Sequence, residues 1–371
     1  MRIVDALGEM PLILGAGPAG CAAAIRLAQN GTSATLLDRD ETVGDPLCGG
    51  FLSWRTVEQL QQLGVDIHAA GAHPLRRLRL FDGSREASLD LPYPAYGLSR
   101  HALDTAMRQV AGKLGVQIRF DEIRGLSSGV AHGKSGNWHS SAIFLATGKH
   151  DVRGQSRPRK GKDTALGIRL RLPPSQQRRQ LLAGAIELHL FDGGYIGIVL
   201  QEGGSVNICL AMRKSALARI GGSPEKLFAY LALENPALAQ RLGDDWHELS
   251  IDTIGAVPYG WIGDTTSTGL FRLGDQAAVI PSLAGEGISI ALASGVSAAD
   301  HFTKGSSAQD FQRNFARMAR KPVRLAQIAW HLAETRLGAR AAIAVAGIAP
   351  SVIATFADMA RIEAAPSLAP R

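Results

Sequence analysis

The sequence predicts an α/β protein in which a Rossmann-type nucleotide-binding domain is combined with an inserted antiparallel sheet and a C-terminal helical segment. Three observations predict this class: a glycine-rich turn between an apolar run and a helical pattern near residue 15, alternating strands joined by glycine-rich turns at 185–212, and an alanine-rich helical pattern after residue 320. The 371 residues are too many for one ordinary core and suit two domains.

The first element is a dinucleotide-binding turn. Leu12-Ile13-Leu14 predicts a buried parallel strand, GAGPAG follows at 15–20, and a helix is expected from Ala19 to Asn30. The glycines of such a motif permit the tight turn, let the backbone approach a pyrophosphate, and let helix and strand pack closely. A second strand ends in Asp38, whose carboxylate can bind ribose hydroxyls, so the complete pattern predicts a bound dinucleotide.

A second cofactor element lies near the other end of the chain. Phe271-Arg-Leu-Gly274-Asp275 predicts a short strand ending in an acid, and a loop rich in glycine and proline then opens a long helix from about Gly287. Such a helix directs its N–H groups and its positive dipole end at an acceptor, and the N1–C2=O region of a flavin is one. An ordinary helix with a glycine-rich entry is the structural alternative.

These motifs resemble those of FAD-dependent oxidoreductases of the p-hydroxybenzoate hydroxylase and geranylgeranyl reductase group. The resemblance covers about residues 11–320 and rests on GAGPAG, on Leu98-Ser-Arg100-His-Ala-Leu-Asp104, and on GDQAAVIPSLAGEGISIAL. It implies one bound FAD, with Arg100 near the pyrophosphate and flavin, Asp275 at the ribityl-phosphate end, and IFLATG (143–148) approaching the cofactor. The cofactor-binding residues implied are Gly15, Gly17, Pro18, Ala19, Gly20, Asp38, Arg39, Cys48, Gly49, Arg100, Ala146, Thr147, Gly148, Asp275, Pro281, Gly285, Gly287 and Ile288.

The chain divides into six predicted segments. The FAD-binding domain takes residues 1–75, 97–160 and 255–320, the substrate domain takes strands at 76–96 and residues 161–254, and 321–371 forms C-terminal helices and a tail. In the substrate domain AIELHL (185–190) places Ile186, Leu188 and Leu190 on one face, so Glu187 and His189 are expected in solvent. GYIGIVL and SVNICLAM complete a predicted antiparallel meander that walls a substrate cavity.

Four residues are candidate catalytic groups. Cys48 lies in DPLCGG (45–50), a loop that in the resembling proteins runs beside the isoalloxazine ring, where glycines let the backbone approach a flat ring. Tyr195 and Trp261 can contact substrate or pack in the core, with the two alternatives equally expected. His150, after the ATG turn, can act as acid or base, although with Asp151 we favour a role in capping a loop.

The resemblance implies an FAD-dependent oxidoreductase and leaves the reaction open. The first hypothesis is an NAD(P)H-driven monooxygenase of secondary metabolism that hydroxylates an aromatic or polyketide-type molecule through a flavin C4a-hydroperoxide. The second is a reductase of prenyl or lipid double bonds, favoured by the Cys-Gly loop, although the Tyr-x-Trp-x-Phe-Pro stretch of such reductases is reduced here to Tyr195. The third is a non-catalytic flavin redox sensor. Since no second GxGxxG follows a strand, NAD(P)H is expected only as a transient donor.

Charge and hydropathy constrain the partners. The net charge of +7 is dispersed without basic–aromatic blocks, which disfavours nucleic acid and fits an anionic cofactor or a membrane surface. Three cysteines without a CxxC predict neither a disulfide framework nor a metal site. The segment after residue 320 predicts two helices broken near Gly347 and Pro350 that pack on the FAD domain or contact lipid. Without a signal-peptide pattern, a cytoplasmic protein able to touch the membrane is expected.

Overall fold

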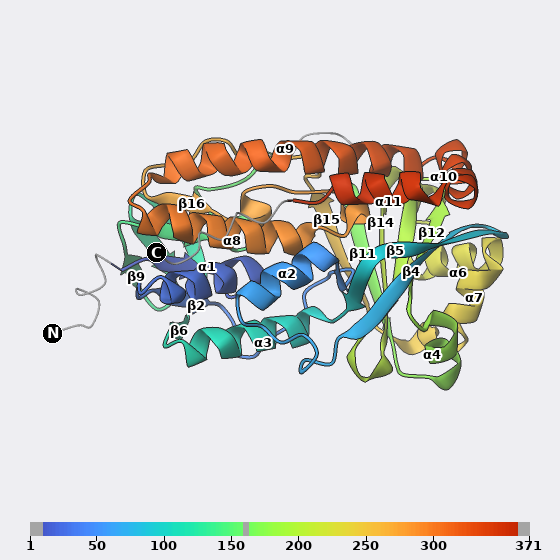
Figure 1. The fold of residues 1–371 in the computed structure, drawn as a ribbon, viewed down its shortest axis with the longest axis horizontal. Coiled ribbons are helices and arrows are strands. Elements are labelled where there is room, and N and C mark those ends of the chain that lie inside the picture. The colour runs from blue at the N-terminus through green and yellow to red at the C-terminus, as the bar shows by residue number, and fades with distance from the viewer. Residues whose placement is uncertain (1–9, 159–162, 363–371) are drawn as a thin grey trace.

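The computed structural model describes residues 10–158 and 163–362, and it shows a nucleotide-binding half and a sheet half joined by a long helix (Figure 1). The first half is built on a five-stranded parallel sheet of order β16-β10-β1-β2-β6. Its strands are β1 (Leu12–Leu14), β2 (Thr35–Asp38), β6 (Gln117–Phe120), β10 (Ile143–Leu145) and β16 (Leu270–Arg272). This arrangement confirms the predicted α/β, Rossmann-type class.

Both faces of the sheet are covered at its central strands, which is why β1 and β10 are apolar throughout. Ile13 of β1 points into a core shared with α1 (Pro18–Gln29), α2 (Trp54–Gln62), α3 (Arg100–Lys113) and α8 (Gly287–Thr303). Leu12 and Leu14 point the other way, onto a three-stranded sheet of β7 (Ile123–Ser127), β8 (Val130–Gly133) and β9 (Asn137–His139). The helices predicted after GAGPAG and from Gly287 are α1 and α8.

The second half is an eight-stranded sheet of order β15-β11-β14-β13-β12-β4-β5-β3. Its strands are β3 (Phe51–Leu52), β4 (His73–Asp82), β5 (Arg85–Gly97), β11 (Ala165–Leu172), β12 (Ala185–Phe191), β13 (Gly194–Leu200), β14 (Val206–Arg213) and β15 (Ile251–Val257). β12, β13 and β14 form the predicted antiparallel meander, with Tyr195 opposite Leu190 and Ala211. Because β4 and β5 join this sheet, the chain crosses between the two halves several times.

The expectation that Glu187 and His189 face solvent is wrong. They do lie opposite Ile186, but that face of the sheet is covered by α4 (Gln176–Leu182), α5 (Lys214–Arg219), α6 (Pro224–Glu234) and α7 (Pro236–Leu242). Glu187 is 0% exposed and accepts hydrogen bonds from Arg241 of α7, from Arg79 and from His189. Alternation along one strand identifies the two faces, whereas the covering helices decide which face is buried.

This cluster makes stability depend on pH. Burial lowers the pKa of His189 below its ordinary value, against the opposing effect of Glu187, so the folded state holds a neutral imidazole. The imidazole of the unfolded chain binds a proton below about pH 6.5, whereas the buried imidazole of the folded state does not. The free energy of unfolding therefore falls as the pH drops below about 6.5. The full loss is about 1.4 kcal/mol for each unit by which the pKa differs between the two states. We expect His189→Gln to flatten the fall in unfolding free energy between about pH 7 and pH 5, measured by urea denaturation. The exposed His139→Gln is the matched control, and equal slopes in the two variants would contradict the assignment.

The C-terminal segment forms three helices where two were expected. They are α9 (Ala308–Ala333), α10 (Arg336–Ile348) and α11 (Pro350–Met359). The additional break follows from Thr335, whose side chain caps α10 by accepting from the N–H of Gly338. No single helix in the described residues is long and apolar enough to cross a membrane; α10 and α11 together meet that criterion but are bent by 113°. The tail predicted after residue 363 lies outside the described residues.

Candidate active site

A cavity of about 1550 Å³ runs from the glycine-rich turn at the N-terminus of α1 to the C-terminal helices. At one end the wall is polar, and it includes Asp38, Arg100, Asp104 and Arg108. At the other end the wall consists of aliphatic and aromatic side chains from the eight-stranded sheet and from α9, α10 and α11. The cavity therefore combines a charged, polar end with an extended apolar end.

The glycine-rich turn at the polar end leaves little or no room for side chains. Gly15 adopts a φ of +104°, and a Cβ there would lie 2.5 Å from the carbonyl oxygen of Ala146. A Cβ on Gly20 would lie 1.9 Å from the carbonyl oxygen of Gly15, and one on Gly17 would lie 3.2 Å from the guanidinium of Arg100. The turn thus exposes the unpaired N–H groups of α1 to an arriving phosphate.

Charges around this turn suit a dinucleotide. The side chain of Arg100 makes a bidentate ion pair with Asp104, with N–O distances of 2.9 and 2.7 Å, beside the N-terminus of α1. Burial alone would lower the pKa of Arg100, but Asp104 holds it above its ordinary value, so the positive charge is permanent. Asp38 accepts from the N–H of Ala16 at 2.6 Å and pairs with Arg108 at 3.2 Å, which fixes its carboxylate at the cavity wall.

The second predicted cofactor element closes the same end of the cavity. Asp275 and the first residue of α8, Gly287, both line the wall. α8 reaches this position because Gly295 packs directly on α1, where a Cβ would lie 2.4 Å from the carbonyl oxygen of Ala19. Buried Arg157 ties the surrounding loops together by donating to Asp151 and to the carbonyl oxygens of Lys149 and Asp275. These donors, acceptors and glycine cradles fit FAD.

The cofactor-binding residues expected from the sequence gather at this wall. All of them line the cavity except Gly20, which packs beneath the turn, and Pro281, which directly precedes the cavity-lining Ser282. Their individual contacts with FAD stay predictions.

Comparison with known proteins decides the class. Residues 10–131 match the family model described as FAD binding domain. The chain is an FAD-dependent oxidoreductase. It is 26% identical over 315 residues to menaquinone reductase of Mycobacterium tuberculosis. This alignment covers 78% of this chain and 75% of the relative.

Solved structures share the fold of the oxidoreductase at low identity. The flavin-dependent brominase Bmp2 superposes with a TM-score of 0.71 at 15% identity, over 95% of this chain and 93% of the other. PqsL of Pseudomonas aeruginosa, described as a probable FAD-dependent monooxygenase, superposes with a TM-score of 0.70 at 14% identity, over 91% of this chain and 99% of the other. These likenesses confirm the p-hydroxybenzoate hydroxylase-like fold.

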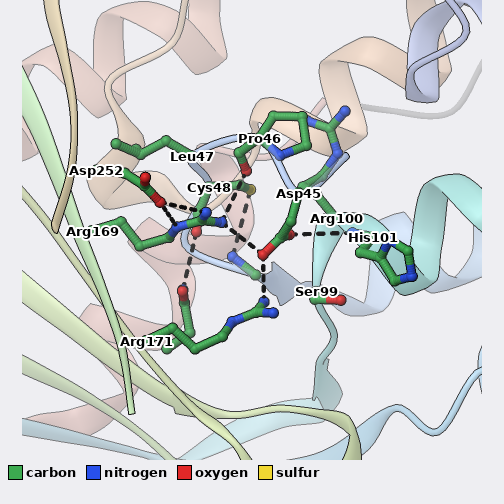
Figure 2. A network of polar contacts seen from close by, with 12 residues as sticks. Asp45, Pro46, Leu47, Cys48, Ser99, Arg100, His101, Arg169, Arg171 and Asp252 are labelled. Atoms are coloured by element: carbon green, nitrogen blue, oxygen red, sulfur yellow. Dashed lines mark hydrogen bonds and ion pairs between the residues drawn. The ribbon is translucent and has the colours of Figure 1, made fainter. Parts of the chain in front are cut away.

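A polar network holds the DPLCGG loop against the sheet (Figure 2). Arg169 of β11 pairs with Asp45 at 3.0 Å and with Asp252 at 2.6 Å, and Arg171 pairs with Asp45 at 2.7 Å. Buried Asn207 of β14 donates to the carbonyl oxygens of Cys48 and Gly49. The loop is thereby anchored at both ends, and Cys48 is presented to the cavity.

Sequence reasoning missed these anchoring residues. Part of the network was predictable from the sequence. Arg169 and Arg171 alternate with apolar residues in ALGIRLRL (165–172), so both side chains lie on the cavity face of β11. Asn207 carries no comparable signal, since a single polar residue in an apolar strand does not reveal its partner.

Two candidate catalytic residues reach the cavity with defined geometry. Cys48 is half-buried, and Tyr195 is 5% exposed with its hydroxyl donating to Ser282 at 2.8 Å. The hydroxyl of Tyr259 lies 2.6 Å from the same Ser282 oxygen, and Trp330 packs edge-on against both tyrosine rings. Burial raises the pKa of Tyr259 to about 12 and that of Tyr195 well above its ordinary value, so both phenols remain protonated.

The other two candidates are less favourably placed. Trp261 is not among the cavity-lining residues, and its ring packs against Gly263, which favours packing in the core over contact with substrate. His150 lines the cavity but is exposed, and its backbone carbonyl accepts from Thr147 and Gln276, which agrees with a loop-stabilising role. Desolvation of the imidazole by the surrounding loops, together with the nearby Arg39, lowers the pKa of His150 below its ordinary value.

Proposed function

We propose that this oxidoreductase is a reductase that saturates a carbon–carbon double bond of a long-chain prenyl lipid. The observation that carries the proposal is the apolar arm of the cavity. Its walls are Leu78, Leu80, Leu188 and Leu190 of the sheet and Ala329, Ala342, Val345, Ile353 and Phe356 of the C-terminal helices. A compact aromatic substrate does not need such a length of aliphatic wall, whereas a flexible hydrocarbon chain does.

The size of the cavity is sufficient for a cofactor and a substrate together, and a relative's name indicates the substrate class. Ordinary small-molecule sites have volumes of roughly 300–1,000 Å³, and the 1550 Å³ found here has to hold both FAD and a substrate. The mycobacterial relative is named menaquinone reductase, and menaquinones are quinones that carry long isoprenoid tails. A prenylated quinone is therefore the substrate class we propose.

Saturating a double bond requires a hydride on one carbon and a proton on the other. When held at the polar end of the cavity, reduced FAD would supply the hydride, and a transient NAD(P)H-type donor would restore its reduced form. The chain supplies the proton: Tyr195 and Tyr259 are protonated, share Ser282 and line the cavity, and Cys48 lies in the anchored loop. We assign the proton to these groups because they are the hydroxyl and thiol donors beside the apolar arm, where aliphatic walls limit the access of water.

Aromatic hydroxylation, with a transient nicotinamide donor, is the second candidate. The hydroxyls of Tyr195, Tyr259 and Ser282 can hydrogen-bond a phenolic oxygen as well as a quinone oxygen, and this feature favours it. The monooxygenase hypothesis drawn from the sequence thus stays a prediction, and the products separate the two reactions.

The test starts from holoprotein that is photoreduced without oxygen and mixed with a detergent-dispersed menaquinone. We expect the flavin to reoxidise and the lipid, after exposure to air, to keep two additional hydrogen atoms by mass spectrometry. The air step matters because a quinol reverts to the quinone whereas a saturated tail does not. Cys48→Ala and Tyr195→Phe, with FAD retained, are each expected to slow the lipid-dependent reoxidation, because each removes a candidate proton donor.

Two results would overturn the proposal. The first is a lipid that returns unchanged after air exposure. The second is an aromatic substrate that gains an oxygen atom from labelled O₂ when the reduced protein meets oxygen, which would establish the monooxygenase instead.

A further inference from the structure

We propose that the outer surface of the C-terminal helices docks on an anionic lipid bilayer and places the mouth of the cavity against it. The docking surface consists of the exposed side chains Ile328, Leu332, Leu337, Ile348, Val352 and Met359. Docking itself stands on the surface described below, whereas the idea that substrate enters through the mouth rests on the proposed function.

Large apolar side chains are concentrated on this surface. The six residues of the docking surface lie within 32 consecutive positions (328–359), and the only other described large apolar side chains that are exposed are Tyr93, Leu114, Phe120, Tyr230 and Leu233. Leu337 is 79% exposed and Ile348 is 87% exposed. Single exposed apolar side chains are common on protein surfaces, but a concentration of large ones is typical of an interaction site.

The cavity opens through the same surface. Leu332 and Val352 are 57% and 55% exposed and also line the cavity, and the exposed Ala341 of α10 lines it as well. These three residues come from α9, α10 and α11 and define a mouth between the helices. A lipid leaving a bilayer against this mouth would reach the apolar arm without crossing water.

The positive charge around the docking surface favours an anionic bilayer as the partner. Residues 311–360 contain seven basic residues and two acidic ones, in a chain whose net charge is +7. Arg313, Arg317, Arg320, Arg324, Ile328 and Leu332 recur every three or four residues, so they form one exposed stripe along α9 that changes from basic to apolar. Basic residues beside an apolar cluster match anionic headgroups beside acyl chains, and this complementarity favours a bilayer over a second protein.

The helices lie on the bilayer and do not cross it. α10 and α11 are bent by 113° relative to each other, and residues of both line the cavity, so they cannot form one straight span. α10 packs on β4 and β5 through Ile343 and Ala346, which keeps its inner face in the protein. The geometry is that of an interfacial attachment from one side.

The test uses full-length holoprotein and vesicles of phosphatidylcholine with or without phosphatidylglycerol. We expect flotation with the anionic vesicles that weakens at high salt, because the basic residues contribute through screened charge. The double variant Leu337→Glu/Ile348→Glu should bind at least about tenfold more weakly, since it places two charges where acyl chains would lie. Leu233→Glu, on α6 and 85% exposed, is the matched control and should bind like the native protein.

The readouts separate docking from catalysis. Flavin absorbance and circular dichroism check that the double variant is folded, as expected because neither replaced side chain is buried or lines the cavity. Reduction of detergent-dispersed menaquinone should be unchanged in the double variant, while reduction of menaquinone held in vesicles should fall. If no lipid is reduced in any form but flotation behaves as expected, the proposed function fails and docking stands.

Three results would overturn docking: native protein that does not float with anionic vesicles, a double variant that floats as well as the native protein, or a native dimer that the double variant converts to a monomer. The last result would identify the surface as a contact between two copies of this chain.

Discussion

An alanine at position 20 is expected to leave the purified protein without FAD. The added Cβ would lie 1.9 Å from the carbonyl oxygen of Gly15, a backbone atom that cannot move without opening the turn. α1 would have to shift away from the strand, and its N-terminal N–H groups would leave the pyrophosphate position. Overpacking of this kind costs about 1–3 kcal/mol, which corresponds to a roughly 5- to 150-fold loss of FAD affinity. We expect FAD occupancy of the purified protein to fall accordingly, measured as flavin absorbance per protein.

The matched control is Gly112→Ala on α3. A Cβ there meets nothing within 4 Å, and the residue is helical, so alanine should retain FAD and stabilise the helix slightly. Gly17→Ala should show an intermediate loss, because its Cβ would lie 3.2 Å from the guanidinium of Arg100, a side-chain group that can yield. Full FAD occupancy in Gly20→Ala would contradict the placement of the cofactor at this turn.

Replacing Arg361 by methionine is expected to lower the free energy of unfolding by about 3–5 kcal/mol near neutral pH. Arg361 pairs with Glu286 at the start of α8 and lies 3.7 Å from the ring centroid of Trp54, and the two charged side chains are 6% and 0% exposed. The variant would leave a buried carboxylate without its partner. Because the pair joins the end of the C-terminal segment to the cofactor end of α8, α11 should loosen first.

The loss should depend on pH in a defined direction. Burial already raises the pKa of Glu286 against the effect of Arg361, and removing Arg361 raises it further. The folded state then binds a proton that the unfolded chain releases above about pH 4.3, so the variant loses stability as the pH rises from there. Urea denaturation between about pH 5 and pH 8 measures this trend.

The double variant Glu286→Gln/Arg361→Met provides the control for the pair. It removes both charges, so it should recover most of the lost stability and show little additional pH dependence. A double variant as unstable as Arg361→Met would show that Arg361 acts through its contact with Trp54 and not through the ion pair.

The sequence by itself determined the elements whose signal is local. The turn after Leu14 and the helix from Gly287 were predictable because glycine spacing, helix propensity and apolar runs act within a few residues of one another. The meander was predictable because alternation separates the two faces of each strand. These elements were sufficient to predict the cofactor.

Only the tertiary structure decided which faces are buried and which distant residues meet. Glu187 became buried because α7 supplies Arg241, 54 positions along the chain, and Cys48 is presented to the cavity by Asn207 and by the Arg169 network, from strands more than 100 positions away. The apolar arm likewise forms only where the C-terminal helices fold back over β4, β5 and β12. Contacts of this kind follow from the packing of whole elements, and no local pattern of residues encodes which elements will meet.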